Sequence, residues 1–64
     1  MTIKNILEVM SANQRIVVED KETKLFTGCY YANNVPMREW KKEVLRIEPY
    51  RGDYAIKLTV NSAE

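Results

Sequence analysis

The segment from 44 to 60 limits the possible folds of this chain more than any other, because it reads as two strands joined by a tight turn. Its second half alternates apolar and mainly polar positions, the period of a strand with one buried face; the apolar positions are Tyr54, Ile56, Leu58 and Val60. In the first half, Leu45 and Ile47 are the expected buried positions, and Pro49 marks the expected end of the strand. Arg51-Gly52-Asp53 supplies the turn, since glycine readily takes a positive φ. We therefore predict a C-terminal β-hairpin.

The N-terminal half predicts a helix followed by another hairpin. Thr2 is a suitable N-cap, and the apolar residues after it have the spacing of one helical face: Ile3, Ile6, Leu7 and Met10. Residues 14–19 contain a β-branched run that favours a strand, and residues 24–31 return as its partner after a polar turn. Gly28 indicates a β-bulge or the close approach of another group. The pattern leaves open which face of this partner strand is buried.

Residues 37–48 allow two interpretations. Met37, Trp40, Val44 and Ile47 have helical spacing, which predicts one long helix ended by Pro49. We prefer a short helix followed by a strand, because the strand at 54–60 needs an antiparallel neighbour at hairpin distance. The predicted fold class is α+β in a single domain, 1–64. It consists of an N-terminal amphipathic helix, a β-hairpin, a short helix and a β-hairpin, forming a small antiparallel sheet or a bent barrel. A three-stranded sheet with two helices is the alternative.

The composition argues against several classes of function. Ten basic and nine acidic residues give a net charge of +1, far from the basic balance of a protein that grips nucleic acid unspecifically. The chain has no histidine, the commonest general base and metal ligand near neutral pH. Cys29 therefore lacks an activating partner, and we interpret it as a small core residue. We expect no enzymatic activity, no cofactor and no metal.

The sequence also bears on the compartment. A lone cysteine fits a reducing environment, and the chain has neither a leader-like segment nor an apolar run that could span a membrane. We therefore expect a cytoplasmic protein that does not act at a membrane. The Arg51-Gly52-Asp53 tripeptide matches the integrin-binding motif, but in a chain without signs of secretion we interpret it as a turn.

Aromatic residues with basic neighbours are the best candidates for a binding surface. On an exposed sheet such side chains can stack bases of single-stranded nucleic acid, and the same residue types are enriched at protein interfaces. They can also be core residues, as expected for Trp40 and Tyr54. Glu39 and Glu43 interrupt the basic residues, which favours a protein partner over phosphate. The candidate partner-binding residues are Tyr30, Tyr31, Arg38, Trp40 and Tyr50.

Several features together resemble small proteins of Firmicutes phages and mobile elements. They are the opening Thr2–Glu8, the late Gly28 of the first hairpin, the Val35-Pro36 step before Trp40, and Val44–Ile47 with the closing strand. The resemblance extends over most of the chain and rests on a pattern of apolar positions. It implies an accessory protein of a mobile element and transfers no functional residue.

We predict from these observations a non-enzymatic accessory protein that acts by protein–protein interaction. A core of this size often depends on a partner or a second copy, so another protein or a homodimer is the expected partner. Pairing across the last strand is one way to form that dimer, if this strand lies at the sheet edge. The alternative is a small barrel-like module that binds single-stranded nucleic acid.

Overall fold

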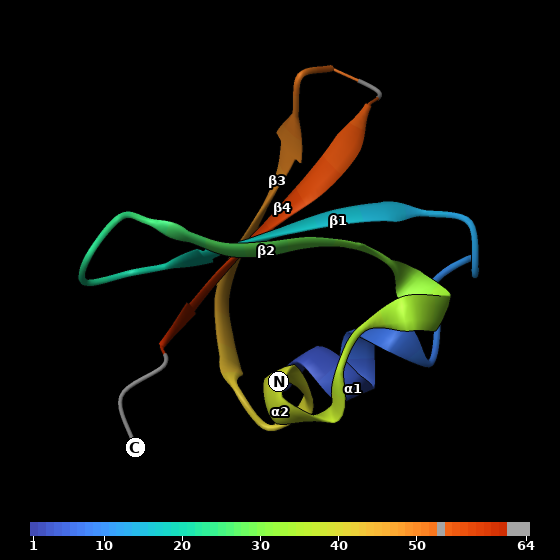
Figure 1. Cartoon of the computed structure of the whole chain (residues 1–64), viewed down its shortest axis with the longest axis horizontal. Coiled ribbons are helices and arrows are strands. Elements are labelled where there is room, and N and C mark those ends of the chain that lie inside the picture. Colours follow the sequence, from blue (N-terminus) through green and yellow to red (C-terminus); the bar gives the residue numbers. More distant parts are fainter. Residues whose placement is uncertain (53, 62–64) are drawn as a thin grey trace.

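The computed structural model describes residues 1–52 and 54–61 and confirms an α+β fold with the predicted order of elements (Figure 1). The elements are α1 (Ile3–Leu7), β1 (Arg15–Asp20), β2 (Phe26–Tyr31), the 3₁₀-helix η1 (Ala32–Asn34), α2 (Met37–Trp40), β3 (Glu43–Tyr50) and β4 (Ala55–Asn61). Residues 37–48 thus form a short helix followed by a strand. None of the helices in the described ranges is long and apolar enough to cross a membrane.

The four strands form one open, mixed sheet in the order β2-β1-β4-β3. Both hairpins are antiparallel as predicted, whereas the central pair, β1 with β4, is parallel. The sheet is therefore neither wholly antiparallel nor closed into a bent barrel. The chain crosses below the sheet through α2, and the second hairpin returns with β4, the last strand, in the centre (Figure 1). The prediction that β4 could offer a free edge is wrong for this reason.

Both helices lie on one side of the sheet, and the core lies between them and the strands (Figure 1). Thr2 caps α1 as predicted: its hydroxyl accepts from the Asn5 N–H at 3.4 Å, while the Asn5 side chain accepts from the Thr2 N–H at 3.0 Å. The helix is shorter than the predicted two turns. The buried cluster consists of Ile3, Ile6, Ile16, Val18, Ala32, Val35, Leu58 and Val60.

The β3 strand differs from the prediction in which of its residues are buried. Leu45 and Ile47 are 47% and 51% exposed, because the register shifts after Val44 and because β3 is an edge strand with one neighbour. Pro49 does not end the strand: it pairs with Ile56, and β3 continues to Tyr50. Proline lacks a backbone N–H, and an edge strand accommodates it because backbone groups that point away from the sheet need no hydrogen-bond partner in the ladder.

The turn between β3 and β4 has the predicted backbone. Arg51 has φ 54° and Gly52 has φ 66°, and two successive positive φ values are typical of tight hairpin turns. Asp53, the third residue of the predicted turn, lies outside the described residues. Tyr54 precedes β4 and is 49% exposed, so the prediction that it belongs to the buried face is wrong.

Candidate functional site

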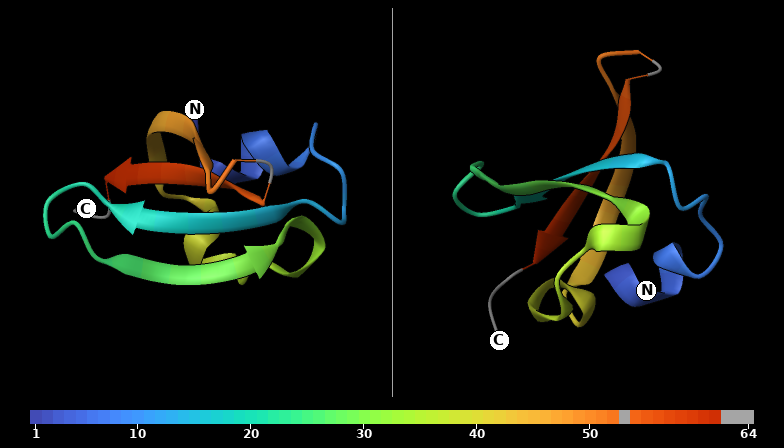
Figure 2. Two further views of the ribbon diagram at one scale, coloured as in Figure 1. Left: turned by 90° about the horizontal axis from the view of Figure 1, so that it is seen from above. Right: turned by 45° about the vertical axis from the view of Figure 1, so that its right-hand side comes forward.

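The face of the sheet turned away from α1 and α2, which we name the open face, carries the second set of alternating side chains. Neighbours of the core residues Ile16 and Val18 point to this face, because successive strand residues point to opposite sides. In Figure 2 (left), β2, β1 and β4 lie side by side. The register places these residues on the open face: Arg15, Val17, Glu19, Cys29, Tyr31, Arg46, Glu48, Tyr50, Lys57 and Thr59.

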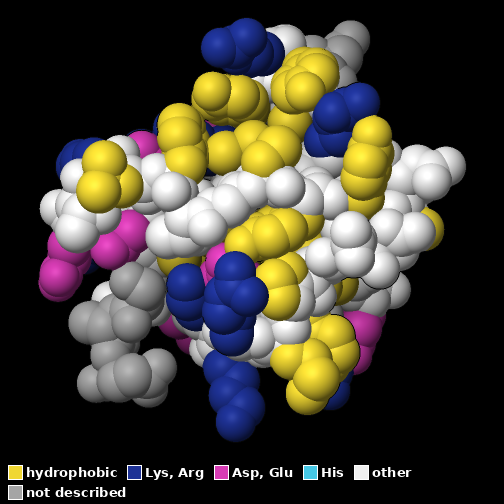
Figure 3. All heavy atoms as spheres, viewed as in Figure 1, with side chains coloured by type: hydrophobic (Ala, Val, Ile, Leu, Met, Phe, Trp, Pro, Cys, Tyr) yellow, Lys and Arg dark blue, Asp and Glu magenta, His cyan; other side chains and the backbone are white. Residues whose placement is uncertain are grey.

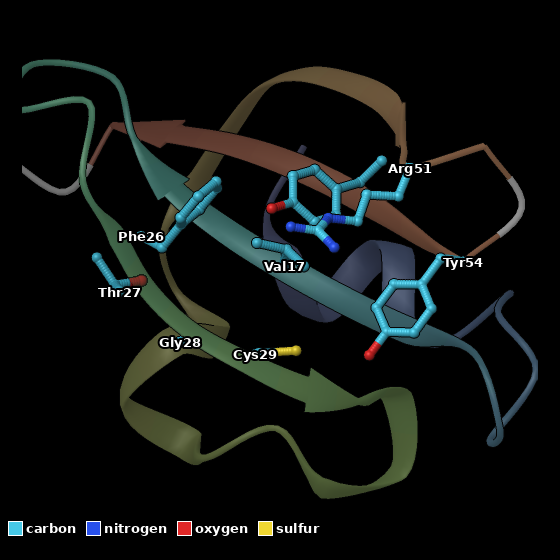
Figure 4. Close-up of a pocket in the computed structure, with 8 residues that line it drawn as sticks. Val17, Phe26, Thr27, Gly28, Cys29, Arg51 and Tyr54 are labelled. Atoms are coloured by element: carbon cyan, nitrogen blue, oxygen red, sulfur yellow. The ribbon is translucent and has the colours of Figure 1, made fainter.

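A hollow of about 430 Å³ lies on the open face where β1 and β2 meet the β3–β4 hairpin. We name it the aromatic hollow; it is lined by Val17, Phe26, Thr27, Gly28, Cys29, Tyr50, Arg51 and Tyr54 (Figure 4). Val17 is buried, although it lies on the face opposite to the core cluster. Phe26 contacts Tyr50 edge to face, with ring centroids 5.6 Å apart. Figure 3 shows hydrophobic side chains beside Lys and Arg side chains near the β3–β4 hairpin.

Two arginines lie against the rings of this surface. The guanidinium carbon of Arg15 is 5.0 Å from the ring centroid of Tyr31 and 4.8 Å from that of Tyr54. Arg15 also donates to the Tyr54 hydroxyl at 3.0 Å, while Arg51 lies 5.6 Å from the ring of Tyr50. Neither arginine has an ion pair with a carboxylate among residues 1–52 and 54–61. Within these ranges, no carboxylate therefore neutralises the two charges.

The other part of the open face is electrostatically balanced. Lys57 lies between two carboxylates, with Nζ–O distances of 3.6 Å to Glu19 and 3.3 Å to Glu48. The hydrogen bond with Glu48 and the two negative charges raise the pKa of Lys57. Glu48 also pairs with Arg46 at 3.4 Å. This part of the face consequently attracts a charged ligand less than the two arginines do.

A polar cluster on the covered side of the sheet involves one of the predicted residues. Glu39 of α2 is only 1% exposed; its Oε2 accepts from the Tyr30 hydroxyl at 2.8 Å and from Thr27 at 3.4 Å. Its Oε1 lies 2.7 Å from Nζ of Lys42, an ion pair without the angle of a well-directed hydrogen bond. The cluster connects α2 to β2.

The charges and hydrogen bonds of this cluster shift two pKa values. Burial is the largest single effect on Glu39 and raises its pKa, but Lys42, Tyr30 and Arg38 together outweigh it, and the pKa is lowered. Burial, followed by the hydrogen bond to Glu39 and the charge of Glu39, raises the pKa of Tyr30. Glu39 is therefore held as a carboxylate and Tyr30 as a neutral donor, as a structural contact requires.

The structure does not bring the five predicted partner-binding residues together. Tyr31 and Tyr50 lie on the open face, as a shared surface requires. Tyr30 points to the covered side, and Trp40 packs against the core and donates from Nε1 to the Val35 carbonyl at 3.0 Å. Arg38 is exposed on α2, outside the aromatic hollow.

The prediction missed several residues in and beside the hollow. Arg15 and Tyr31 face each other across the β1–β2 ladder, so the register of the hairpin would have identified this pair. Phe26 and Val17 line the hollow itself, and both belong to the predicted strands. Cys29 is exposed beside them, contrary to its interpretation as a core residue. It lies on the open face, where no helix covers it.

The chemistry of the open face is that of binding. Rings and a buried valine offer apolar contact, and the two arginines offer charge-assisted hydrogen bonds. In the described parts of the chain, no three Cys, Asp or Glu side chains gather as ligands of a metal ion. Comparisons of the chain with protein-family models, with curated proteins and with solved structures found no match.

Proposed function

We propose that this chain is a non-enzymatic, cytoplasmic accessory module that binds another protein through the aromatic hollow. One observation carries the proposal: aromatic rings and Arg51 line a hollow, Arg15 lies beside it against the ring of Tyr54, and neither arginine has a carboxylate partner in the described residues. Tyrosine and arginine are enriched among the residues that contribute most to protein interfaces.

The geometry supports a partner segment with an apolar side chain next to a carboxylate. The apolar side chain would contact Val17 and Phe26 in the hollow. The carboxylate would accept hydrogen bonds from Arg15, whose side chain the rings of Tyr31 and Tyr54 already hold in place. Such preorganisation reduces the entropy lost on binding.

Single-stranded nucleic acid is supported less well, although the rings could stack bases. A backbone-binding surface requires a continuous row of positive charge. Here Glu19 and Glu48 neutralise Lys57 on the same face, and the whole chain has a net charge of only +1. We therefore treat nucleic acid as an outcome of the test.

The test is selection from a displayed library of random peptides on the immobilised full chain. We expect enrichment of peptides in which an aromatic or aliphatic residue adjoins Asp or Glu. Phe26→Ala should weaken the binding of a selected peptide about 30-fold, the effect of a typical hot-spot residue. Arg15→Ala should remove the preference for the acidic residue.

Leu25→Ala is the matched control. Leu25 adjoins Phe26 and is 66% exposed, against 51% for Phe26, but it does not line the hollow. It should leave peptide binding unchanged. Enrichment of unrelated sequences, or binding that Phe26→Ala does not affect, would contradict the proposal. Salt-sensitive binding of an oligothymidine, lost in Arg15→Ala, would favour the nucleic-acid alternative instead.

A further inference from the structure

The two edges of the sheet are built differently, and the edge formed by β3 is protected. Pro49 has no N–H, and a register shift interrupts the ladder after Val44. The N-terminal residues lie along the start of this strand: Thr2 bridges Glu43, and the Val44 N–H donates to the Met1 carbonyl at 2.7 Å. Proline, irregular register and covering segments are features by which proteins prevent edge-to-edge pairing.

The edge formed by β2 has neither a proline, such as Pro49 of β3, nor a charged side chain. Its six residues are Phe26–Tyr31, and each of them is exposed or half-buried. A register shift affects the end near Phe26, but Gly28 to Tyr31 pair regularly with β1. This regular segment can accept a further strand.

The hydrogen bonds of the hairpin show which backbone groups point outward. The Ala32 N–H donates to the Gln14 carbonyl at 2.9 Å. Because hydrogen-bonded positions alternate along an antiparallel pair, Tyr30 opposite Ile16 also bonds towards β1. The N–H and C=O of Cys29 therefore point away from β1, and among the described residues no group outside β1 bonds to them.

We propose that two copies of this chain pair antiparallel through their β2 edges, with Cys29 opposite Cys29 of the second copy at the two-fold axis. Two-fold pairing sets a strand against itself, so a strand without charges meets no like-charge repulsion. A 64-residue chain buries a small core, and association with a second copy is one way in which such small domains gain stability. This inference does not rest on the proposed function.

The pairing would extend the aromatic hollow across the axis. With Cys29 at the centre, Tyr30 of one copy lies opposite Gly28 of the second copy, and Gly28 lines the hollow. The Cα atoms of the two central residues would lie about 5.5 Å apart, the spacing of a hydrogen-bonded pair. Two hollows would then belong to one continuous open face. A partner with two binding segments could occupy both hollows.

Light scattering behind size exclusion, at several concentrations of the full chain, is the first test. We expect twice the chain mass of 7.5 kDa. Cys29→Lys and Cys29→Glu should each give the single-chain mass, because like charges then meet at the axis. An equimolar mixture of the two variants should restore the dimer. Since Cys29 is the one cysteine, a short bis-maleimide should link two wild-type chains, which provides a readout that needs no variant.

Leu45→Lys is the control, because Leu45 is exposed on the opposite edge strand; it should leave the dimer intact. A wild-type chain that stays at 7.5 kDa at every concentration overturns the proposal. So does a dimer that persists in both charged variants, or one that bis-maleimide does not link. Circular dichroism of each variant shows that it is folded before its mass is interpreted.

Discussion

Replacing Tyr30 by Phe removes one hydroxyl and tests whether the buried cluster stabilises the fold. The hydroxyl donates at 2.8 Å to Glu39, whose side chain is 1% exposed. A hydrogen bond to a charged group contributes about 1.5–3 kcal/mol. Lys42 and Thr27 continue to contact Glu39, so we expect a loss near the lower end, about 1.5–2 kcal/mol. A chain of this length has a total stability of about 3–10 kcal/mol, so the loss is a large fraction.

Urea unfolding followed by circular dichroism measures this loss. With a slope of about 1 kcal/mol per molar urea for a small domain, the midpoint should fall by about 1.5–2 M. Tyr31→Phe is the matched control. Tyr31 follows Tyr30 in the sequence, but its ring lies on the open face and its hydroxyl has no hydrogen bond to a described residue. It should change the free energy of unfolding by less than about 0.5 kcal/mol. Equal effects of the two substitutions would refute the reasoning.

The pH dependence provides a second readout of the same contact. Because the pKa of Glu39 is lowered in the folded state, its ionisation stabilises the protein above the ordinary pKa of 4.5. That stability is lost as the pH falls through the lower folded-state pKa. Tyr30→Phe removes one cause of the shift. The difference in stability between wild type and variant should therefore be largest near neutral pH and shrink on acidification.

Three further predictions concern the same side of the sheet. Gly28→Ala places a methyl group on the Tyr30 hydroxyl, so it should cost about 1–3 kcal/mol in urea unfolding and much less in a Tyr30→Ala background. Because the pKa of Tyr30 is raised above its ordinary value of 10.0, stability should fall as the pH rises beyond that value; Tyr30→Phe should lessen this fall in alkaline melting curves. Trp40→Phe removes the donor to the Val35 carbonyl and should cost about 0.5–1.5 kcal/mol in thermal unfolding.

The sequence predicted those parts of the fold that depend on local pattern. Thr2 at the helix start and the alternation of Ile56, Leu58 and Val60 each depend on near neighbours, and the structure confirms them. The parallel pairing of β1 with β4 depends on how α2 crosses the sheet. No local pattern encodes that crossing. The prediction of a wholly antiparallel sheet failed at this point.

The candidate site was predicted in part, for a related reason. Tyr31 and Tyr50 carry the right side chains and lie on the open face. Tyr30 is the same type of residue as Tyr31. Successive strand residues point to opposite faces, however, so the side chain of Tyr30 points to Glu39 on the covered side. Arg15 and Phe26 come together with Tyr50 and Tyr54 only through the sheet order β2-β1-β4-β3. Sequence alone does not give that order.

The central parallel pair has a consequence for how the chain folds during synthesis. The neighbour of β1 is the last strand of the structure; Glu19 and Thr59, which pair across it, are 40 positions apart. Until β4 leaves the ribosome, the first hairpin has no partner on its inner edge. Contacts of such sequence separation slow folding, and unpaired strand edges favour aggregation in the meantime. Folding of this small domain therefore has to wait until β4 has been synthesised.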